Sequence, residues 1–219
     1  MLKLNNKCYF LLTNQKYSVY YKITNVILYI CEVMLMARTI KYSKEDILEK
    51  SVEFIKIHGY SKLTARELVK YIGCSTQPIF KNYESFDMYK KDLKLYLRRD
   101  YSAFIGKYVD IKDYLYTISY AYALYAKKEP NIFFSLFMAD LADSRTINEV
   151  LNTDRNIETI NAMIKQYKIS LEEAKRVYRE VRFYTHGIAT QLCVNSIKLT
   201  DNEIKDLIKN NIEINLRGI

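Results

Sequence analysis

The sequence predicts an all-α fold, and three observations support this prediction. The chain of 219 residues contains only 5 glycines and 2 prolines, too few for the many tight turns of an all-β protein. Apolar residues recur every three or four positions, which is the period of a helix with one buried face. No stretch alternates apolar and polar residues as a half-buried strand does. The 49% of hydrophobic and 27% of charged residues exclude a disordered chain.

Residues 1–35 form an N-terminal extension without a clear helix entry. Its first apolar run is too short for the core of a signal peptide, and no small-residue cleavage site follows. Its second run, 26–36, contains Glu32 and is about half as long as a membrane-spanning helix. Two interpretations remain. The extension is either an apolar helix packed on the protein, or an upstream stretch included by a misplaced start codon, with Met34 or Met36 as the true start. We expect no membrane partner.

The first clear helix is predicted between Ser43 and Gly59. Ser43 and Asp46 have the spacing of an N-terminal cap, in which each side chain satisfies a free backbone amide of the first turn. Gly59 is a typical C-terminal stop. The residues expected on its buried face are Ile47, Leu48, Ser51, Val52 and Ile55.

Two shorter helices are predicted next. Thr64 and Glu67 have the spacing of a full capping box, so a helix is expected from there to Gly73, with Leu68, Val69 and Ile72 buried. Ser75 is expected to cap a third helix over about 76–82, since Pro78 is tolerated in a first turn. Its core-facing residues would be Ile79 and Tyr83.

Two short helices joined by a tight glycine-containing turn are typical of a helix-turn-helix, whose second helix enters the major groove of DNA. The motif would span about 64–83 within a domain of residues 36–85. Gln and Asn pair with adenine edges, Thr contacts the thymine methyl group, and Lys reaches guanine or phosphate. Such side chains face outward on the second helix, although short capped helices also occur in plain bundles. The predicted DNA-binding residues are Thr64, Ser75, Thr76, Gln77, Pro78, Phe80, Lys81 and Asn82.

The net charge of +9 is concentrated in the N-terminal part. Residues 36–100 carry 14 basic and 9 acidic side chains, whereas 101–219 carry 16 and 15. We therefore expect the N-terminal part to face a polyanion and the remainder to do something else.

The stretch ILEKSVEFIKIHGYSKLTARELVKYIGCSTQPIFKNYES, residues 47–85, closely resembles the DNA-binding domain of the TetR family of bacterial transcriptional regulators. The likeness lies in the glycine after the first helix, the threonine that opens the second, and the pair Ile79-Phe80 before Tyr83. The resemblance implies a homodimer on pseudo-palindromic double-stranded operator DNA, usually a repressor released by a small molecule. The chain departs from the family at Phe86-Asp87, where a phosphate-binding lysine is common, and Lys90 or Lys91 is a possible replacement.

Residues 86–219 are expected to form a helical ligand-binding and dimerisation domain, joined to the helix-turn-helix by a long helix over about 85–105. Tilting of this helix would change the distance between the two DNA-binding domains of the expected homodimer. Glu129-Pro130 and Ser170 mark helix boundaries. Helices are predicted over 88–104, 114–126, 132–141, 147–167, 171–197 and 202–216. The last two carry apolar stripes that suit a core and a twofold interface.

Aromatic side chains of this domain suggest a pocket for a bulky, partly apolar effector, although at helical spacing they are more often core. The predicted ligand-binding residues are Phe104, Tyr122, Phe133, Phe137, Tyr184 and His186.

No local triad, phosphate loop or metal-ligand spacing is present, so we expect neither an enzyme nor a cofactor nor a metal. The four cysteines stand far apart, which favours a reducing, cytoplasmic location. The primary interpretation is a ligand-responsive repressor. The alternatives are a constitutive or architectural DNA-binding dimer without a ligand, and a small helical enzyme.

Overall fold

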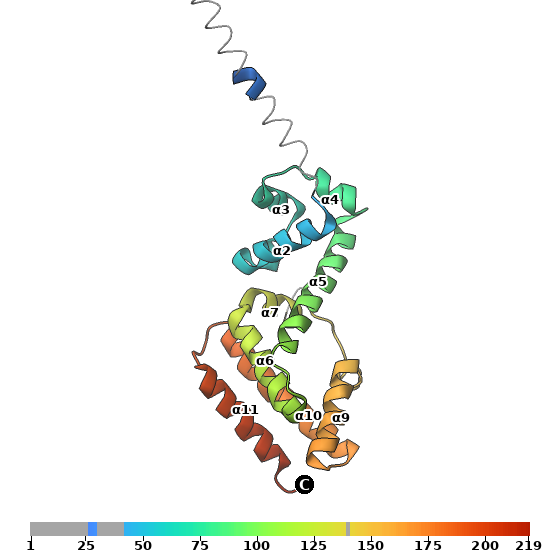
Figure 1. The fold of residues 1–219 in the computed structure, drawn as a ribbon, viewed down its shortest axis with the longest axis vertical. Helices are drawn as coiled ribbons and strands as arrows, with labels where there is room; N and C mark the ends of the chain where they lie inside the picture. Colours follow the sequence, from blue (N-terminus) through green and yellow to red (C-terminus); the bar gives the residue numbers. More distant parts are fainter. Residues whose placement is uncertain (1–25, 30–41, 139–140) are drawn as a thin grey trace, which may run out of the picture. The chain divides into compact units, whose positions relative to one another are not determined.

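The computed structural model describes residues 26–29, 42–138 and 141–219. The chain divides into two compact units, Met1–Tyr42 and Ser43–Ile219. Of the first unit only the helical turn 26–29 and Tyr42 are described, so the expectations for residues 1–35 lie otherwise outside the described residues. The second unit is built of helices, and its described part contains no strand, which confirms the all-α prediction (Figure 1).

The second unit begins with three helices in the predicted places. They are α2 (Lys44–His58), α3 (Ala65–Ile72) and α4 (Gln77–Asn82), and a short 3-10 helix, η1 (Tyr60–Lys62), follows α2. Ser43 and Asp46 form the predicted capping box at the start of α2.

Two capping predictions in this region are wrong in detail. At Thr64 only half of the expected box is present, because the Thr64 hydroxyl accepts from the Glu67 amide while no Glu67 side-chain bond returns to Thr64. Ser75 does not cap α4. The residue directly before α4 is Thr76, and its side chain makes no capping hydrogen bond either. Its φ of −71° and ψ of −13° are already helical, whereas a capping residue has an extended backbone.

A single long helix, α5 (Phe86–Gly106), connects this region to the rest of the unit. Ser85 caps it by accepting from the Met88 amide, as expected for a helix over 85–105. Its buried side chains recur about every four residues and form one stripe along its length. The helix packs against α2 and α4 at one end and against α6 and α7 at the other (Figure 1). The stripe consists of Tyr89, Leu93, Leu97 and Ile105.

The remaining helices are η2 (Ile111–Asp113), α6 (Tyr114–Lys128), α7 (Pro130–Phe137), α8 (Ile147–Leu151), α9 (Asp154–Tyr167), α10 (Leu171–Cys193) and α11 (Asp201–Leu216). Most of them pack around α10, while η2 and α8 contact α9. Helix α10 contacts α6, α7, α9 and α11, and its buried face is the predicted apolar stripe. No described helix has the length and apolar character needed to cross a bilayer.

The predicted single helix over 147–167 is wrong, because the chain breaks into α8 and α9 at Asn152-Thr153. The Asn152 side chain donates to the Asn148 carbonyl at 2.9 Å, and Thr153 has the extended backbone of a helix-preceding residue. Asn, Thr and Asp in succession favour such a break, because their side chains compete for backbone hydrogen bonds. The helix predicted to reach residue 197 also ends earlier, at Cys193.

Candidate functional site

The turn between α3 and α4 is tight and depends on Gly73. This residue has a φ of 79° and a ψ of 32°, in the left-handed region that glycine adopts without strain. The amides of Gly73 and Cys74 both donate to the Val69 carbonyl, at 2.9 and 3.0 Å, and so close the end of α3. The turn therefore directs α4 away from α3 after only four residues.

Helix α4 is buried on one side and free on the other. Ile79 is completely buried, and Tyr83, directly after the helix, is 3% exposed, as predicted. On the opposite side Gln77 and Lys81 are exposed, and the Phe80 ring is 52% exposed. An exposed aromatic beside amide and ammonium groups has no role in the core of this unit.

The other predicted DNA-binding residues differ in how exposed and how free their side chains are. Thr64, Ser75 and Thr76 are exposed, and the Thr64 hydroxyl is engaged in its cap. Pro78 and Asn82 are half-buried, and the Asn82 amide nitrogen donates to the Pro78 carbonyl at 2.8 Å.

The charges around α3 and α4 are unbalanced. Several lysines of α2 and α5 form ion pairs, such as Lys50 with Glu53 and Lys90 with Asp87. By contrast, five cations between residues 62 and 91 form no ion pair with any described residue. Sequence reasoning missed Arg66 and Lys70, although their i, i+4 spacing places both on one face of α3. The five are Lys62, Arg66, Lys70, Lys81 and Lys91.

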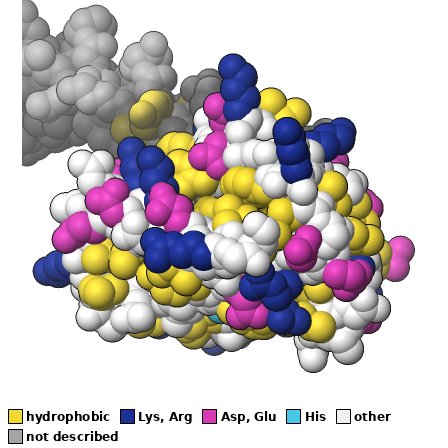
Figure 2. Space-filling model, turned by 90° about the horizontal axis from the view of Figure 1, so that it is seen from below, with side chains coloured by type: hydrophobic (Ala, Val, Ile, Leu, Met, Phe, Trp, Pro, Cys, Tyr) yellow, Lys and Arg dark blue, Asp and Glu magenta, His cyan; other side chains and the backbone are white. Residues whose placement is uncertain are grey.

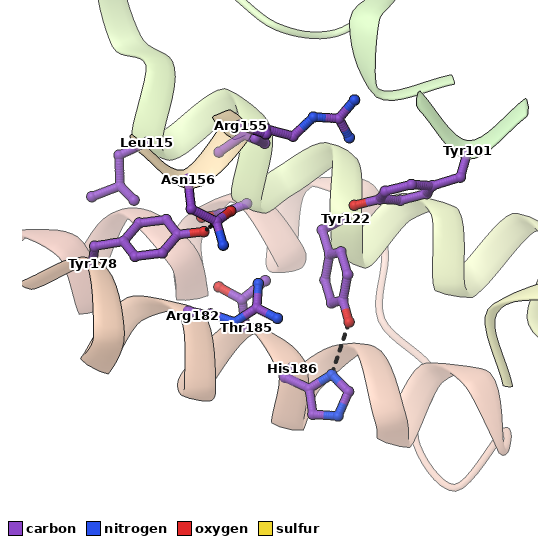
Figure 3. Close-up of a pocket in the computed structure, with 11 residues that line it drawn as sticks. Tyr101, Leu115, Tyr122, Arg155, Asn156, Tyr178, Arg182, Thr185 and His186 are labelled. Carbon is purple, nitrogen blue, oxygen red and sulfur yellow. Dashed lines mark hydrogen bonds between the residues drawn. The ribbon is translucent and has the colours of Figure 1, made fainter. Parts of the chain in front are cut away.

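A second candidate site is a cavity of about 60 Å³ between α5, α6, α9 and α10 (Figure 3). This volume holds a few water-sized groups, well below the several hundred Å³ typical of pockets for drug-sized ligands. The cavity is thus smaller and more polar than the one expected for a bulky effector. Its walls combine three tyrosines, two arginines and smaller groups: Tyr101, Leu115, Ile118, Ser119, Tyr122, Arg155, Asn156, Tyr178, Arg182, Thr185 and His186.

The structure brings only part of the predicted ligand-binding set to this cavity. Tyr122 and His186 line it, and the rings of Phe133 and Phe137 pack on Tyr122 at centroid distances of 5.1 and 5.3 Å. Phe137, Tyr122 and His186 also line a neighbouring, larger pocket.

Two members of the predicted set lie elsewhere. The Phe104 ring packs against Tyr108 and Tyr125 at centroid distances of 5.1 and 5.0 Å, so it is part of the aromatic packing and does not line the cavity. Tyr184 is on the outer side of α10 and 37% exposed, because its position is one residue away from the buried Thr185. Neither residue therefore lines the cavity, and their predicted role in ligand binding stays a prediction.

The polar groups of the cavity form two internal hydrogen bonds. The Tyr122 hydroxyl and His186 Nδ1 are 2.9 Å apart, and the Tyr178 hydroxyl donates to Asn156 Oδ1 at 2.6 Å (Figure 3). Burial, and secondarily the Arg182 charge, lower the pKa of His186, so its imidazole is neutral at pH 7. Burial also raises the pKa of Tyr122 and Tyr178, which keeps both phenols protonated.

Sequence reasoning missed the charged groups of this cavity. Arg155 and Arg182 face it from α9 and α10 (Figure 3). A signal existed on α10, where Tyr178, Arg182 and His186 are spaced by four residues and share one face. Nothing local relates them to Arg155 or to Tyr101, because only the packing of separate helices brings these groups together.

Comparison with models of known protein families gives no match, and no curated protein matches the sequence. In the described part of the chain, no group of three or more His, Cys, Asp or Glu side chains is placed to hold a metal ion.

Proposed function

We propose that the protein is a sequence-specific DNA-binding transcriptional regulator that acts as a homodimer, a repressor released by a small-molecule effector. The observation that carries this proposal is the pair α3–α4, joined through Gly73, with Ile79 and Tyr83 buried and the side chains of Gln77 and Lys81 left free. This is the arrangement that a recognition helix needs, since its polar face must reach base edges.

The distribution of charge supports the same interpretation. Five cations that form no ion pair with a described residue lie on and beside α3 and α4, where they suit phosphate contacts. Figure 2 views the unit from the end farthest from α3 and α4, and there basic and acidic side chains are interspersed. The distribution of charge therefore favours binding of a polyanion at the α3–α4 end.

The outer face of α10 supports a homodimer. Phe183 is 57% exposed, Tyr184 on the same helix is also exposed, and so is Val194, directly after the end of α10. Gly187 lies between them, and no atom lies within 4 Å of a Cβ built there, so another helix can approach closely. An exposed apolar face of this kind suits a twofold interface between copies.

Two contacts would link an effector in the cavity to the DNA-reading helices. Helix α5 runs from the cavity wall to α4, and α7 contacts α2. At the second contact Lys56 and Glu129 form an ion pair at 2.8 Å, and the Asn131 amide donates to the Lys56 carbonyl at 2.8 Å. A ligand that favours one arrangement of α5 and α7 would shift the population of DNA-binding dimers.

Selection of binding sites from random double-stranded DNA by the full chain tests the proposal. We expect a pseudo-palindromic site with half-sites about one helical turn apart, about 34 Å or somewhat more. Gln77→Ala should relax specificity at one position by about 1–3 kcal/mol. Lys165→Ala on α9 is the matched control and should bind as the wild type does. Failure to enrich any sequence would refute the proposal.

The small cavity favours one alternative, a constitutive DNA-binding dimer without an effector. The two functions differ in one measurement. A constitutive protein keeps the same operator affinity in the presence of any compound that binds it, whereas a regulated one loses affinity by the factor given by reciprocal linkage.

A further inference from the structure

The cavity between α5, α6, α9 and α10 contains two positive charges without a negative partner. Neither Arg155 nor Arg182 forms an ion pair with a described carboxylate, and none of the described residues lining the cavity is Asp or Glu. The tyrosine hydroxyls beside them stay protonated and supply no negative charge. Partly buried guanidinium groups without a counter-charge are costly, and proteins usually pair them.

A third group of the cavity is also without a partner. Thr185 is 2% exposed, and its hydroxyl oxygen is buried and makes no hydrogen bond. Most buried hydroxyls are hydrogen-bonded, so an orphaned one that borders an empty space indicates a group missing from that space. Thr185 is on α10, one turn from Arg182, and both side chains lie next to each other in Figure 3.

The other polar side chains of the cavity are largely satisfied. Asn156 accepts from Tyr178 and donates to the Val150 carbonyl, and Tyr122 and His186 bond to each other. Arg155 donates to the Ser102 hydroxyl and interacts with the Tyr101 hydroxyl, and Arg182 interacts with the Tyr178 hydroxyl. A guanidinium group has five N–H donors, so both arginines keep donors beyond these contacts. What remains unused is therefore a set of donors with net positive charge.

We infer that this cavity binds the oxyanion group of a small molecule, a carboxylate or phosphate held by Arg155, Arg182 and Thr185. Such a group accepts from all three donors and neutralises the two charges. The volume of about 60 Å³ limits the enclosed part to a few non-hydrogen atoms, flanked by the rings of Tyr101 and Tyr122. This inference rests on the proposed function and names the chemical class of its effector.

Thermal unfolding of the full chain tests the inference with three probes: acetate, benzoate and inorganic phosphate, each against sodium chloride at equal ionic strength. We expect at least one anion to raise the melting temperature in a saturable way. Arg182→Gln and Arg155→Gln should weaken binding of that anion by about tenfold or more, and Thr185→Val should weaken it several-fold. Arg179→Gln is the matched control, because Arg179 is on α10 but pairs with Glu180. It should respond as the wild type does.

A structural role for the arginines predicts a different result. If they only stabilise the fold, Arg182→Gln lowers the melting temperature without any probe. Our inference predicts an unliganded melting temperature no lower than that of the wild type, because an unbalanced charge is removed. A saturable response equal in all variants, or none to any probe, would overturn the inference.

These measurements contain no DNA, so their failure is separate from that of the proposed function. Where an anion binds, operator affinity is measured with and without it, and we expect weaker operator binding in its presence. An anion that occupies the cavity yet leaves operator affinity unchanged would overturn its assignment as effector while the proposed DNA binding stands.

Discussion

The surface of α3 and α4 and the cavity beside α10 both contain unpaired cations, but in different surroundings. Lys81 and Lys70 are exposed to water, where a lone charge costs little and can be screened. Arg155 and Arg182 are half-buried among aromatic rings. An unpaired charge is therefore weak evidence for a ligand at the surface and stronger evidence inside a cavity, because only there does the missing partner cost much free energy.

Truncation of a buried side chain of α4 should have the largest effect on the free energy of unfolding. Ile79→Ala is expected to lower the free energy of unfolding by about 2–5 kcal/mol, because a fully buried side chain is truncated. Urea unfolding followed by circular dichroism measures it. Phe80→Ala is the matched control on the same helix, and a loss as large as that of Ile79→Ala would contradict the burial pattern of α4.

The turn between α3 and α4 gives the next largest effect. Gly73→Ala should destabilise the protein by about 1–2 kcal/mol, because alanine is strained at a φ of 79°. Gly106→Ala at the end of α5 is the opposite control and should stabilise by about 0.5 kcal/mol, because no atom lies within 4 Å of the new methyl group and the backbone there is helical. If both variants change the melting temperature in the same direction, the predicted difference between the two glycines is wrong.

The cavity should make stability depend on pH through His186. Because burial lowers the pKa of this imidazole in the folded state, the unfolded chain binds more protons, and stability falls as the pH drops below about 6.5. His186→Asn should remove this part of the loss. The measurement compares melting temperatures at pH 7.5 and 5.5, and an equal loss in both proteins would contradict a depressed pKa at His186.

The smallest effect on stability is expected at Lys81. Lys81→Ala should change the free energy of unfolding by less than about 0.5 kcal/mol, because the side chain is exposed and unpaired. If Lys81 contacts phosphate, the slope of the logarithm of DNA affinity against that of salt should fall by about 1. Fluorescence anisotropy over a range of salt concentrations provides the slope, and an unchanged slope would exclude that contact.

Local signals in the sequence were enough for most helix boundaries. Ser43 and Ser170 cap helices at the predicted entries, because a cap depends on residues three apart, and α5 begins close to the predicted Ser85. The turn at Gly73 is equally local. The missing cap at Ser75 and the break at Asn152-Thr153 were not predicted, because the helical backbone at Thr76 decided the first and competing side-chain bonds the second.

The cavity was predictable only in part. Tyr122 and His186 were recognised as polar aromatic groups of the right domain, whereas Arg155 and Thr185 carry no local signature of a site. Their role is inferred from the missing counter-charge of Arg155 and the missing hydrogen bond of Thr185, and sequence spacing reports neither. For the same reason, Phe104 and Tyr184 could not be distinguished from cavity residues, because helical spacing alone does not say which neighbour a face meets.

The long helix α5 has a consequence for folding cooperativity. Tyr89 and Leu93 are buried near its start, and Leu97 and Ile105 farther along, so one rod contributes to the packing at both ends. Loss of either end would expose half of its apolar stripe and shorten its helical hydrogen-bond ladder. Residues 43–219 should therefore unfold in one step, with amide protons of α2 and α10 exchanging through the same global opening.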